Sequence, residues 1–507
     1  MERKWWTLVL SSIATFMLLL DITVVNVALP DIQRDLDASL SSLQWVVDAY
    51  SLMLAAFLLT AGSLGDRLGR RRVFSLGLGL FTFASFLCGI AGDPTLLNLA
   101  RGLQGIGGAA MFATSLALIG QEFHGKDRAT AFGIWGATVG GAVAIGPLVG
   151  GLITEHLGWE WIFFVNIPIG VVAVVLTEMR LANVAAQDPQ RIDLPGLATF
   201  SGGLFLLIFG LIRGNPEGWG SATIVASLAG SAALLLAFFA IEARSSHPML
   251  DLSLFRKPAF NGVSAVAFGL SAGMFAMFLY LTIYMQGVLD FSPLETGLRF
   301  LPLTVLSFVV APISGKLSQR VPIRILVGVG LGLVGVGLLS MYGLDADSDI
   351  SALLPGFLIA GVGIGLTNPS IGQVAIAVVP AAKAGMGSGI NTTFRQVGIA
   401  TGVASLGAVF QSQVASKLSS LLPGAPPGLA EAVSSGGSRA AATAAPPGQR
   451  VEIVHAAKVA FVSGFNEILL IGAILSFAGA ALGFALIHPR DFVQPQKEPE
   501  AAEPVAA

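Results

Sequence analysis

Two oppositely charged residues, Asp21 and Arg101, lie within long apolar runs of the sequence. A charge near the centre of a bilayer costs about 2.5–3.5 kcal/mol, so each should face a protein interior or a water-filled cavity. At about 1.5 Å per helical residue, Asp21 would lie ~12 Å and Arg101 ~10 Å below the same membrane face. The chemistry open to such residues is reversible proton binding by the carboxylate, with the arginine as its electrostatic partner. A purely structural salt bridge is the alternative.

The composition is that of an integral membrane protein. The 507 residues are 54% hydrophobic and only 11% charged, which does not fit an ordinary soluble domain. The net charge is −2 and the basic residues are scattered, so nothing indicates nucleic-acid binding. Cys88 is the single cysteine, which excludes an intramolecular disulfide and any multi-cysteine metal site.

Fourteen apolar runs are long enough, at about 20 residues each, to cross the hydrocarbon core. Lys and Arg are concentrated in the loops of one face when the N-terminus is placed in the cytoplasm, so both termini should be cytoplasmic. The predicted spans are 6–29, 43–64, 73–92, 95–120, 130–153, 161–179, 195–213, 221–241, 259–286, 298–316, 323–343, 352–378, 386–411 and 461–487.

The sequence also repeats itself imperfectly. Residues 60–73, TAGSLGDRLGRRRV, are echoed by ISGKLSQRVPIRIL at 313–326. Such repeats are typical of transporters built from two halves, with a substrate site between them near the midplane. The second half lacks the buried charge of the first, because Phe357 stands where the first half has Arg101. The expected parts are an N-terminal six-helix bundle (1–180), two inserted transmembrane helices (181–255), a C-terminal six-helix bundle (256–488) with a flexible outer loop (412–460), and a disordered cytoplasmic tail (489–507).

Several motifs resemble, in the right order, those of the major facilitator superfamily and in particular of its fourteen-segment drug:proton antiporters. The resemblance covers essentially the whole chain except both ends and residues 412–460. It implies an all-α membrane protein with two six-helix bundles and two inserted helices. The motifs are LDITVVNVALP at 20–30, GSLGDRLGRRRV at 62–73, LNLARGLQGIGGAA at 97–110, GAVAIGPLVGGL at 141–152, GWEWIFFVNIPIG at 158–170 and GSGINTTFRQVGIATG at 387–402.

The resemblance implies an inner gate between the two halves at residues 62–73. Glycines permit a tight turn there, and a carboxylate can accept hydrogen bonds from an arginine or a helix N-terminus. A basic loop that only fixes the topology is the alternative, but it leaves the aspartate unexplained. The gate residues are Gly62, Asp66, Arg67, Gly69 and Arg70.

Small residues recur every four positions in the predicted fifth span, at Ala142, Gly146 and Gly150. Such a stripe lets another helix approach closely, and Pro147 favours a kink. With Gly151, these residues form the segment that resembles the antiporter motif, although Ala142 stands where that motif usually has glycine. The resemblance implies a role in sealing the cavity against proton leak, and generic helix packing is the competing account.

Seven further residues are candidates for contact with a substrate. Methionine and aromatic side chains suit a cavity that accepts varied apolar molecules, although such residues also serve plain helix packing. Glu467 is the second candidate for the proton site; the alternative is a structural salt bridge or a side chain that snorkels from a position close to its helix end. The candidates are Trp135, Met277, Tyr280, Tyr284, Asn391, Arg395 and Glu467.

The sequence does not favour an enzyme. Its five histidines form no metal-spaced cluster, and it contains no phosphate-binding glycine-lysine loop, so the proton gradient is the expected energy source, with no cofactor and no metal. We expect a monomeric, proton-coupled exporter of small amphipathic molecules, such as drugs, dyes or metabolites, in a bacterial inner membrane. The alternatives are an exporter of lipids or endogenous metabolites with the same fold and, less favoured, a channel.

Overall fold

The computed structural model describes residues 2–38, 40–182, 193–245, 248, 250–380, 384–423, 428–434 and 450–493. Throughout these ranges the ordered elements are helices, and no strand occurs in them. Thirteen of the helical segments are long and apolar enough to cross a membrane. The expectation of an all-α membrane protein is therefore confirmed.

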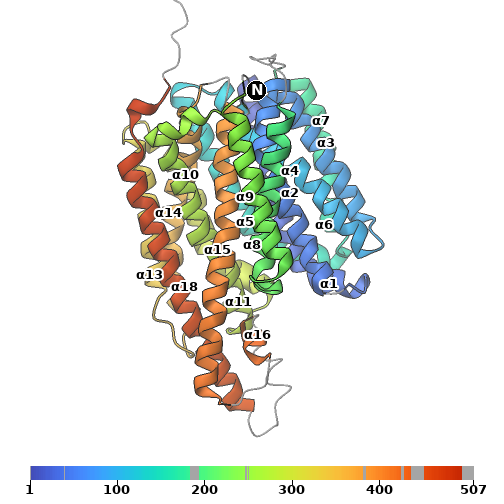
Figure 1. Ribbon diagram of the computed structural model, residues 1–507, viewed down its shortest axis with the longest axis vertical. Coiled ribbons are helices and arrows are strands. Elements are labelled where there is room, and N and C mark those ends of the chain that lie inside the picture. The colour runs from blue at the N-terminus through green and yellow to red at the C-terminus, as the bar shows by residue number, and fades with distance from the viewer. Residues whose placement is uncertain are drawn as a thin grey trace, which may run out of the picture.

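The first half consists of seven helices that cover the first six predicted spans (Figure 1). The sixth span, 161–179, is divided into two helices that meet at Val165. The helices are α1 (Arg3–Asp35), α2 (Leu40–Leu68), α3 (Arg70–Gly89), α4 (Pro94–Glu122), α5 (Gly125–Leu157), α6 (Trp161–Phe164) and α7 (Asn166–Arg180).

The remainder of the chain supplies the inserted pair, α8 (Leu194–Glu217) and α9 (Ala222–Glu242), and then the second half. The ninth predicted span is interrupted by a π-helical turn, η2, between α10 and α11. The second half contains η1 (Leu252–Arg256), α10 (Pro258–Leu270), η2 (Ser271–Phe275), α11 (Ala276–Gly287), α12 (Pro293–Leu317), α13 (Ile323–Ser340), η3 (Ile350–Ala352), α14 (Leu354–Ala377), α15 (Ala384–Leu421), α16 (Leu429–Ser434), α18 (Arg450–Leu486) and η5 (Pro489–Asp491).

Of the fourteen predicted spans, only 130–153 has no counterpart among the thirteen apolar helical segments. It lies inside α5, a continuous helix of 33 residues. Several α5 side chains, including that of Pro147, lie outside the described part of the chain, and α5 is not counted among the thirteen helices. Fourteen spans therefore remain a prediction.

Residues 412–421 and 450–460 are helical rather than part of a loop, because α15 and α18 continue well past their apolar segments. Both helices project beyond the rest of the bundle at the end opposite the N-terminus (Figure 1). Val414 and Leu418 are buried on the extension of α15, and Phe410 stacks edge-on against Phe461 with 4.9 Å between ring centroids. This packing stabilises the parts of the two helices that extend beyond the predicted spans 386–411 and 461–487. Residues 424–427 and 435–449 lie outside the described part.

The expected tail also begins later than residue 489. The backbone N–H of Ala259 donates to the Asp491 carboxylate at 3.0 Å, and that of Val493 donates to the Ala377 carbonyl at 2.8 Å. Residues 489–493 are thus held against α10 and α14, and residues 494–507 lie outside the described part.

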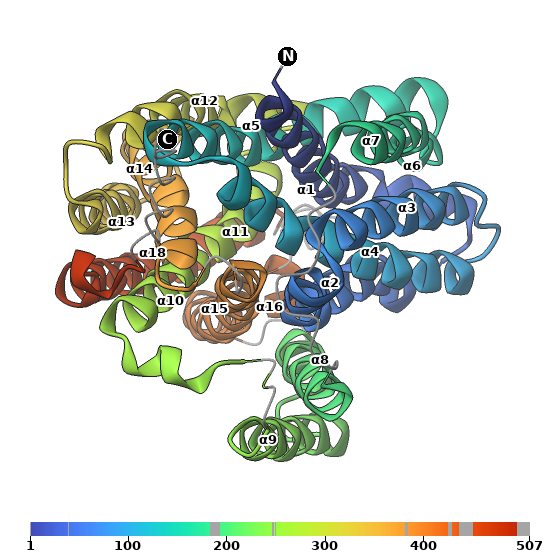
Figure 2. The ribbon, with the colours of Figure 1, turned by 90° about the horizontal axis from the view of Figure 1, so that it is seen from above.

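Helices α8 and α9 lie to one side of the two bundles (Figure 2). The Thr60 and Ser201 hydroxyls, on α2 and α8, are 2.8 Å apart, and the Asn215 amide on α8 donates to the Ala404 carbonyl on α15 at 2.9 Å. The inserted pair therefore contacts the first half through α2 and the second half through α15.

Candidate functional site

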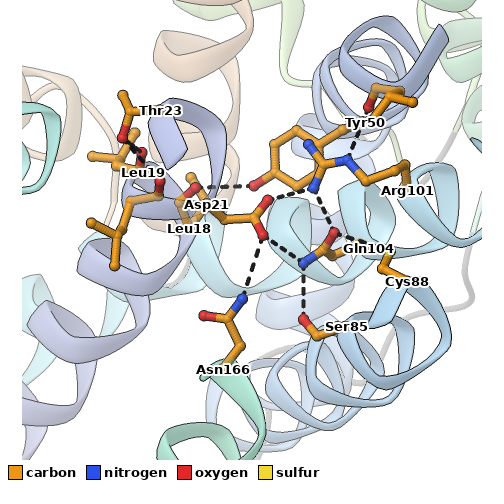
Figure 3. Close-up of polar contacts among 12 residues, drawn as sticks. Leu18, Leu19, Asp21, Thr23, Tyr50, Ser85, Cys88, Arg101, Gln104 and Asn166 are labelled. Atoms are coloured by element: carbon orange, nitrogen blue, oxygen red, sulfur yellow. Dashed lines mark hydrogen bonds and ion pairs between the residues drawn. The ribbon is translucent and has the colours of Figure 1, made fainter. Parts of the chain in front are cut away.

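Asp21 and Arg101 are in direct contact, as their predicted depths in the membrane indicated (Figure 3). An Arg101 Nη1 hydrogen bond reaches Asp21 Oδ2 at 2.5 Å. The two residues are only 3% and 1% exposed. A buried ion pair of this kind is stable only when the remaining donors and acceptors also find partners, because both charges have lost their water.

Those partners are polar side chains on three helices, α3, α4 and α7. Gln104 Nε2 donates to Asp21 Oδ1 at 2.9 Å and to Ser85 Oγ at 2.9 Å, while Gln104 Oε1 accepts from Arg101 Nη1 at 2.6 Å. The Asn166 amide donates to Asp21 Oδ1 at 3.4 Å. Each oxygen of the carboxylate therefore has at least one donor, and the pair is enclosed by α1, α3, α4 and α7.

The guanidinium of Arg101 has further contacts with α2 and α6. Its Nε donates to the Val46 carbonyl at 2.9 Å, and the ring of Tyr50 lies 4.3 Å from the guanidinium carbon. The Phe163 ring lies 5.8 Å away on α6. Arg101 thus retains partners that do not depend on the charge of Asp21.

The sequence around Arg101 explains its position. The Asp93 carboxylate caps α4 by accepting the N–H groups of Thr95 at 2.9 Å and Leu96 at 3.0 Å, and Pro94 occupies the first turn. Arg101 and Gln104 are three residues apart, so they lie on one face of α4. At Gly105 a Cβ would collide with the Tyr50 carbonyl, so glycine lets α2 approach closely enough to contact Arg101.

Sequence reasoning missed Gln104, Ser85, Asn166 and Tyr50. Gln104 and Asn166 stand inside the motifs at 97–110 and 158–170, and a polar residue three positions from a buried arginine is a usable signal. Sequence reasoning also passed over Asp48, a partly buried carboxylate in the α2 span.

Asp66 connects the two halves. Arg70 donates to Asp66 Oδ1 through Nε at 3.0 Å and Nη2 at 2.9 Å. The backbone N–H of Met386, in the first turn of α15, donates to Asp66 Oδ2 at 2.9 Å. The carboxylate therefore occupies a helix N-terminus, whose first N–H groups have no partner within the helix.

The other residues of the 62–73 segment support this geometry. Gly69 separates α2 from α3 with a φ of 97°, which strongly favours glycine. Arg67 donates to the Pro248 carbonyl at 3.3 Å, and Arg70 Nη1 donates to Gln121 Oε1 at 3.0 Å. Gly62 is buried in α2.

The Asp66 contacts lie at the face of the bundle that bears the N-terminus, called here the N-terminal face, and the halves also meet closely deeper in the bundle. A Cβ at Gly389 of α15 would lie 3.0 Å from the Leu58 carbonyl of α2. A Cβ at Gly136 of α5 would lie 2.9 Å from the Pro369 ring of α14. The structure is therefore closed between the halves near the N-terminal face.

Gly146 and Gly150 of α5 face α1. A Cβ at Gly146 would lie 2.6 Å from the Cβ of Thr23, two residues after Asp21, and one at Gly150 would lie 3.1 Å from the Val24 Cα. Ala142 is fully buried, whereas a Cβ at Gly151 would meet no atom within 4 Å. Pro147 also lies in α5, but its side chain lies outside the described part.

The seven candidates for substrate contact are not brought together. Trp135 is 1% exposed in the core of the first half and donates to Thr15 Oγ1 at 3.0 Å. Met277, Tyr280 and Tyr284 are buried in the core of the second half. In this conformation these four side chains fill the hydrophobic cores.

The two tyrosines have structural contacts. The Tyr280 hydroxyl donates to the Val403 carbonyl at 2.8 Å, and the Tyr284 hydroxyl donates to the Ser348 carbonyl at 3.2 Å. Glu467 is partly exposed on α18, seventeen residues after the start of that helix rather than near its end. Asn391 and Arg395 lie on α15.

No group of three His, Cys, Asp or Glu residues that could hold a metal ion occurs among the described residues. Cys88 is buried, with its thiol 3.7 Å from Gln104 Oε1.

Three features together define a membrane transporter. The spanning helices form two halves, one half holds a buried ion pair, and a carboxylate of that half caps a helix of the other. The sequence model of the Major Facilitator Superfamily matches residues 11–403, and the chain belongs to that family. The resemblance drawn from the motifs is therefore confirmed.

Two bacterial proteins are similar to this chain over most of their own length. The chain is 37% identical over 413 residues to the multidrug resistance protein Stp of Mycobacterium tuberculosis, covering 81% of this chain and 77% of that protein. It is 31% identical over 484 residues to the multidrug efflux pump LfrA of Mycolicibacterium smegmatis, covering 95% of each. Among solved structures, the proton:xylose symporter XylE superposes with a TM-score of 0.64 at 12% identity, covering 96% of each chain.

Proposed function

We propose that this protein is a proton-driven exporter of small amphipathic molecules that works by alternating access. The observation that carries the proposal is the Asp21–Arg101 pair, a carboxylate and a guanidinium 2.5 Å apart in the membrane interior. The printed names of the relatives, a multidrug resistance protein and a multidrug efflux pump, support export as the direction.

Asp21 is the proposed proton carrier. Protonation removes its negative charge and weakens its attraction to Arg101, which keeps the Val46 carbonyl and Gln104 as partners. The freed α1 can then shift against α5, which it contacts at Gly146 and Gly150. Deprotonation restores the pair and the original packing. Protonation at one face and deprotonation at the other would thus couple proton entry to a change of conformation.

Asp66 is the proposed latch. Its bonds to Arg70 and to the Met386 N–H hold α2 against α15 at the N-terminal face. If that face is cytoplasmic, as the distribution of Lys and Arg predicts, the conformation described here is closed to the cytoplasm. Opening the transporter inward then requires these hydrogen bonds to break.

The proton gradient is sufficient as the sole energy source. One proton moving through 100 mV supplies ~2.3 kcal/mol, which supports roughly fiftyfold accumulation of a neutral substrate. The proposal therefore includes no cofactor. We also propose that the protein is a monomer in the inner membrane, with both termini in the cytoplasm.

Flux measurements on the purified protein in liposomes test the proposal. Uptake of a substrate found by an efflux panel in a pump-deficient host should saturate, should run uphill with an imposed ΔpH, and should stop when an uncoupler is added. Flux that does not saturate and never runs uphill would instead indicate a channel.

A further inference from the structure

The second half contains an arginine whose charge is not balanced. Arg395 lies in α15 within the membrane-spanning segment. Its single recorded contact is with the ring of Phe275, 5.5 Å from the guanidinium carbon, and no hydrogen bond or ion pair joins it to any residue in the described ranges. Arg101, by contrast, has a carboxylate, a glutamine and a carbonyl as acceptors.

A second unused donor lies one turn away on the same helix face. Asn391 is 3% exposed, and its Nδ2 has no hydrogen-bond partner among the described residues. Residues four apart on a helix are neighbours, so this amide and the guanidinium can reach one ligand group. Both offer N–H donors, and the ligand that matches them carries acceptors and negative charge.

The position of this pair suits a transported molecule. Arg395 follows Met386, which contacts Asp66 at the N-terminal face, by nine residues, or about 14 Å along the helix. This places it near the middle of a hydrocarbon core about 30 Å thick. Phe275 belongs to the π-helical turn η2, and such turns occur frequently at functional sites.

Aromatic rings continue from Phe275 into the second half. The ring centroids of Phe275 and Phe278 are 5.8 Å apart, and those of Phe278 and Phe300 are 5.3 Å apart. All three side chains are partly exposed. An apolar, aromatic surface therefore starts beside the unbalanced charge.

We propose that Asn391 and Arg395 bind the acidic group of an organic anion, such as a carboxylate or sulfonate, and that Phe275, Phe278 and Phe300 contact its apolar body. An anion at this position supplies the counter-charge that the described residues do not, and arginine suits planar anions because its donors form a fixed fork. The inference rests on the proposed function and names the substrate class: amphipathic acids.

Binding to the full-length protein in nanodiscs, without a proton gradient, tests this inference. The probes are anilinonaphthalene sulfonate and phenylnaphthylamine, which share an aromatic frame and differ in the sulfonate. Wild-type protein should prefer the sulfonate, and Arg395→Gln should weaken its binding about tenfold or more while changing binding of the neutral amine less than about twofold.

Two further variants control for charge and for folding. Arg395→Lys should retain part of the preference because it keeps the positive charge. Arg299→Gln removes an arginine that also lies over a phenylalanine ring, with its guanidinium carbon 3.6 Å from the Phe291 ring centroid. Because Arg299 lies near the start of α12, away from Arg395 in the sequence, the substitution should leave both affinities unchanged.

The proposal would be overturned if the wild-type protein bound the two dyes with equal affinity. It would also be overturned if Arg395→Gln weakened the binding of both dyes by the same factor. The result is independent of the proton mechanism. A protein that prefers the sulfonate but cannot transport uphill refutes proton coupling and leaves the anion site standing, and the reverse pattern refutes only the anion site.

Discussion

The two halves of this transporter treat buried charge in opposite ways. The first half holds Asp21 and Arg101 in a network in which every charged group has a partner. At the position that corresponds to Arg101, the second half has Phe357, whose side chain is 1% exposed. The centroids of the Phe357 and Phe300 rings are 5.5 Å apart. Its one arginine at comparable depth, Arg395, contacts an aromatic ring instead of an acid.

This difference indicates a division of labour between two halves that share an imperfect sequence repeat. A balanced ion pair can respond to a proton, because protonation of one partner changes the stability of the whole network. An unbalanced cation beside aromatic rings can respond to a substrate that brings its own charge. In our proposal the first half therefore couples the proton, and the second half binds the transported molecule.

Removing the cation from the balanced half should have the largest effect. Arg101→Met leaves Asp21 buried without its counter-charge, which should cost about 3–5 kcal/mol and lower the unfolding temperature in detergent. The control Arg34→Met breaks an exposed pair with Asp31 and should cost only about 0–1 kcal/mol. Equal destabilisation by the two substitutions would contradict the special status of the buried pair.

Separating α1 from α5 should have the next largest effect. In Gly146→Leu the new side chain collides with Thr23, so export should be lost or protons should leak across liposomes. Gly79→Leu is the matched control, because a Cβ there meets no atom within 4 Å. A fully active and tightly coupled Gly146→Leu would show that the contact between these helices is not needed.

Weakening the latch should slow transport without unfolding the protein. Asp66→Asn keeps the shape of the side chain but loses the charge that strengthens its bonds to Arg70 and the Met386 N–H, so turnover in liposomes should fall about tenfold. Substrate binding and the unfolding temperature should stay close to those of the wild type. Normal turnover by well-expressed Asp66→Asn would count against the latch.

A carboxylate of the second half should matter least. Glu467 is partly exposed on α18, so Glu467→Gln should change ΔpH-driven transport by less than about twofold. Loss of coupling in this variant would move proton chemistry into the second half and break the comparison.

Much of the fold was predictable because membrane spans are long apolar runs and the halves repeat. Sequence reasoning also placed Asp21 and Arg101 at one depth, since depth follows from counting residues along a helix. It could not show that they touch, because contact depends on which faces of α1 and α4 meet. The hydrogen bond from the Met386 N–H to Asp66 could not be predicted for another reason: the sequence does not indicate which backbone N–H group a carboxylate will accept.

The errors concern places where polarity misleads. The outer ends of α15 and α18 were expected to be a loop because they are too polar for a membrane, yet both helices continue through them, and Val414 and Leu418 are buried on the extension of α15. Met277, Tyr280 and Tyr284 were proposed as substrate contacts because of their chemical types; they are buried in a core in this conformation, and their contact with a substrate stays a prediction. Composition alone cannot distinguish a cavity wall from packed interior.

The most direct test of the central claim is uphill transport by Asp21→Asn in liposomes with an imposed ΔpH. Asparagine can still accept a hydrogen bond from Arg101, so the variant should fold, reach the membrane and bind substrate. The account predicts that it no longer accumulates substrate against a gradient. It also predicts that adding substrate releases protons from the wild-type protein and not from Asp21→Asn. Uphill transport by purified Asp21→Asn would contradict the account and place the proton site elsewhere.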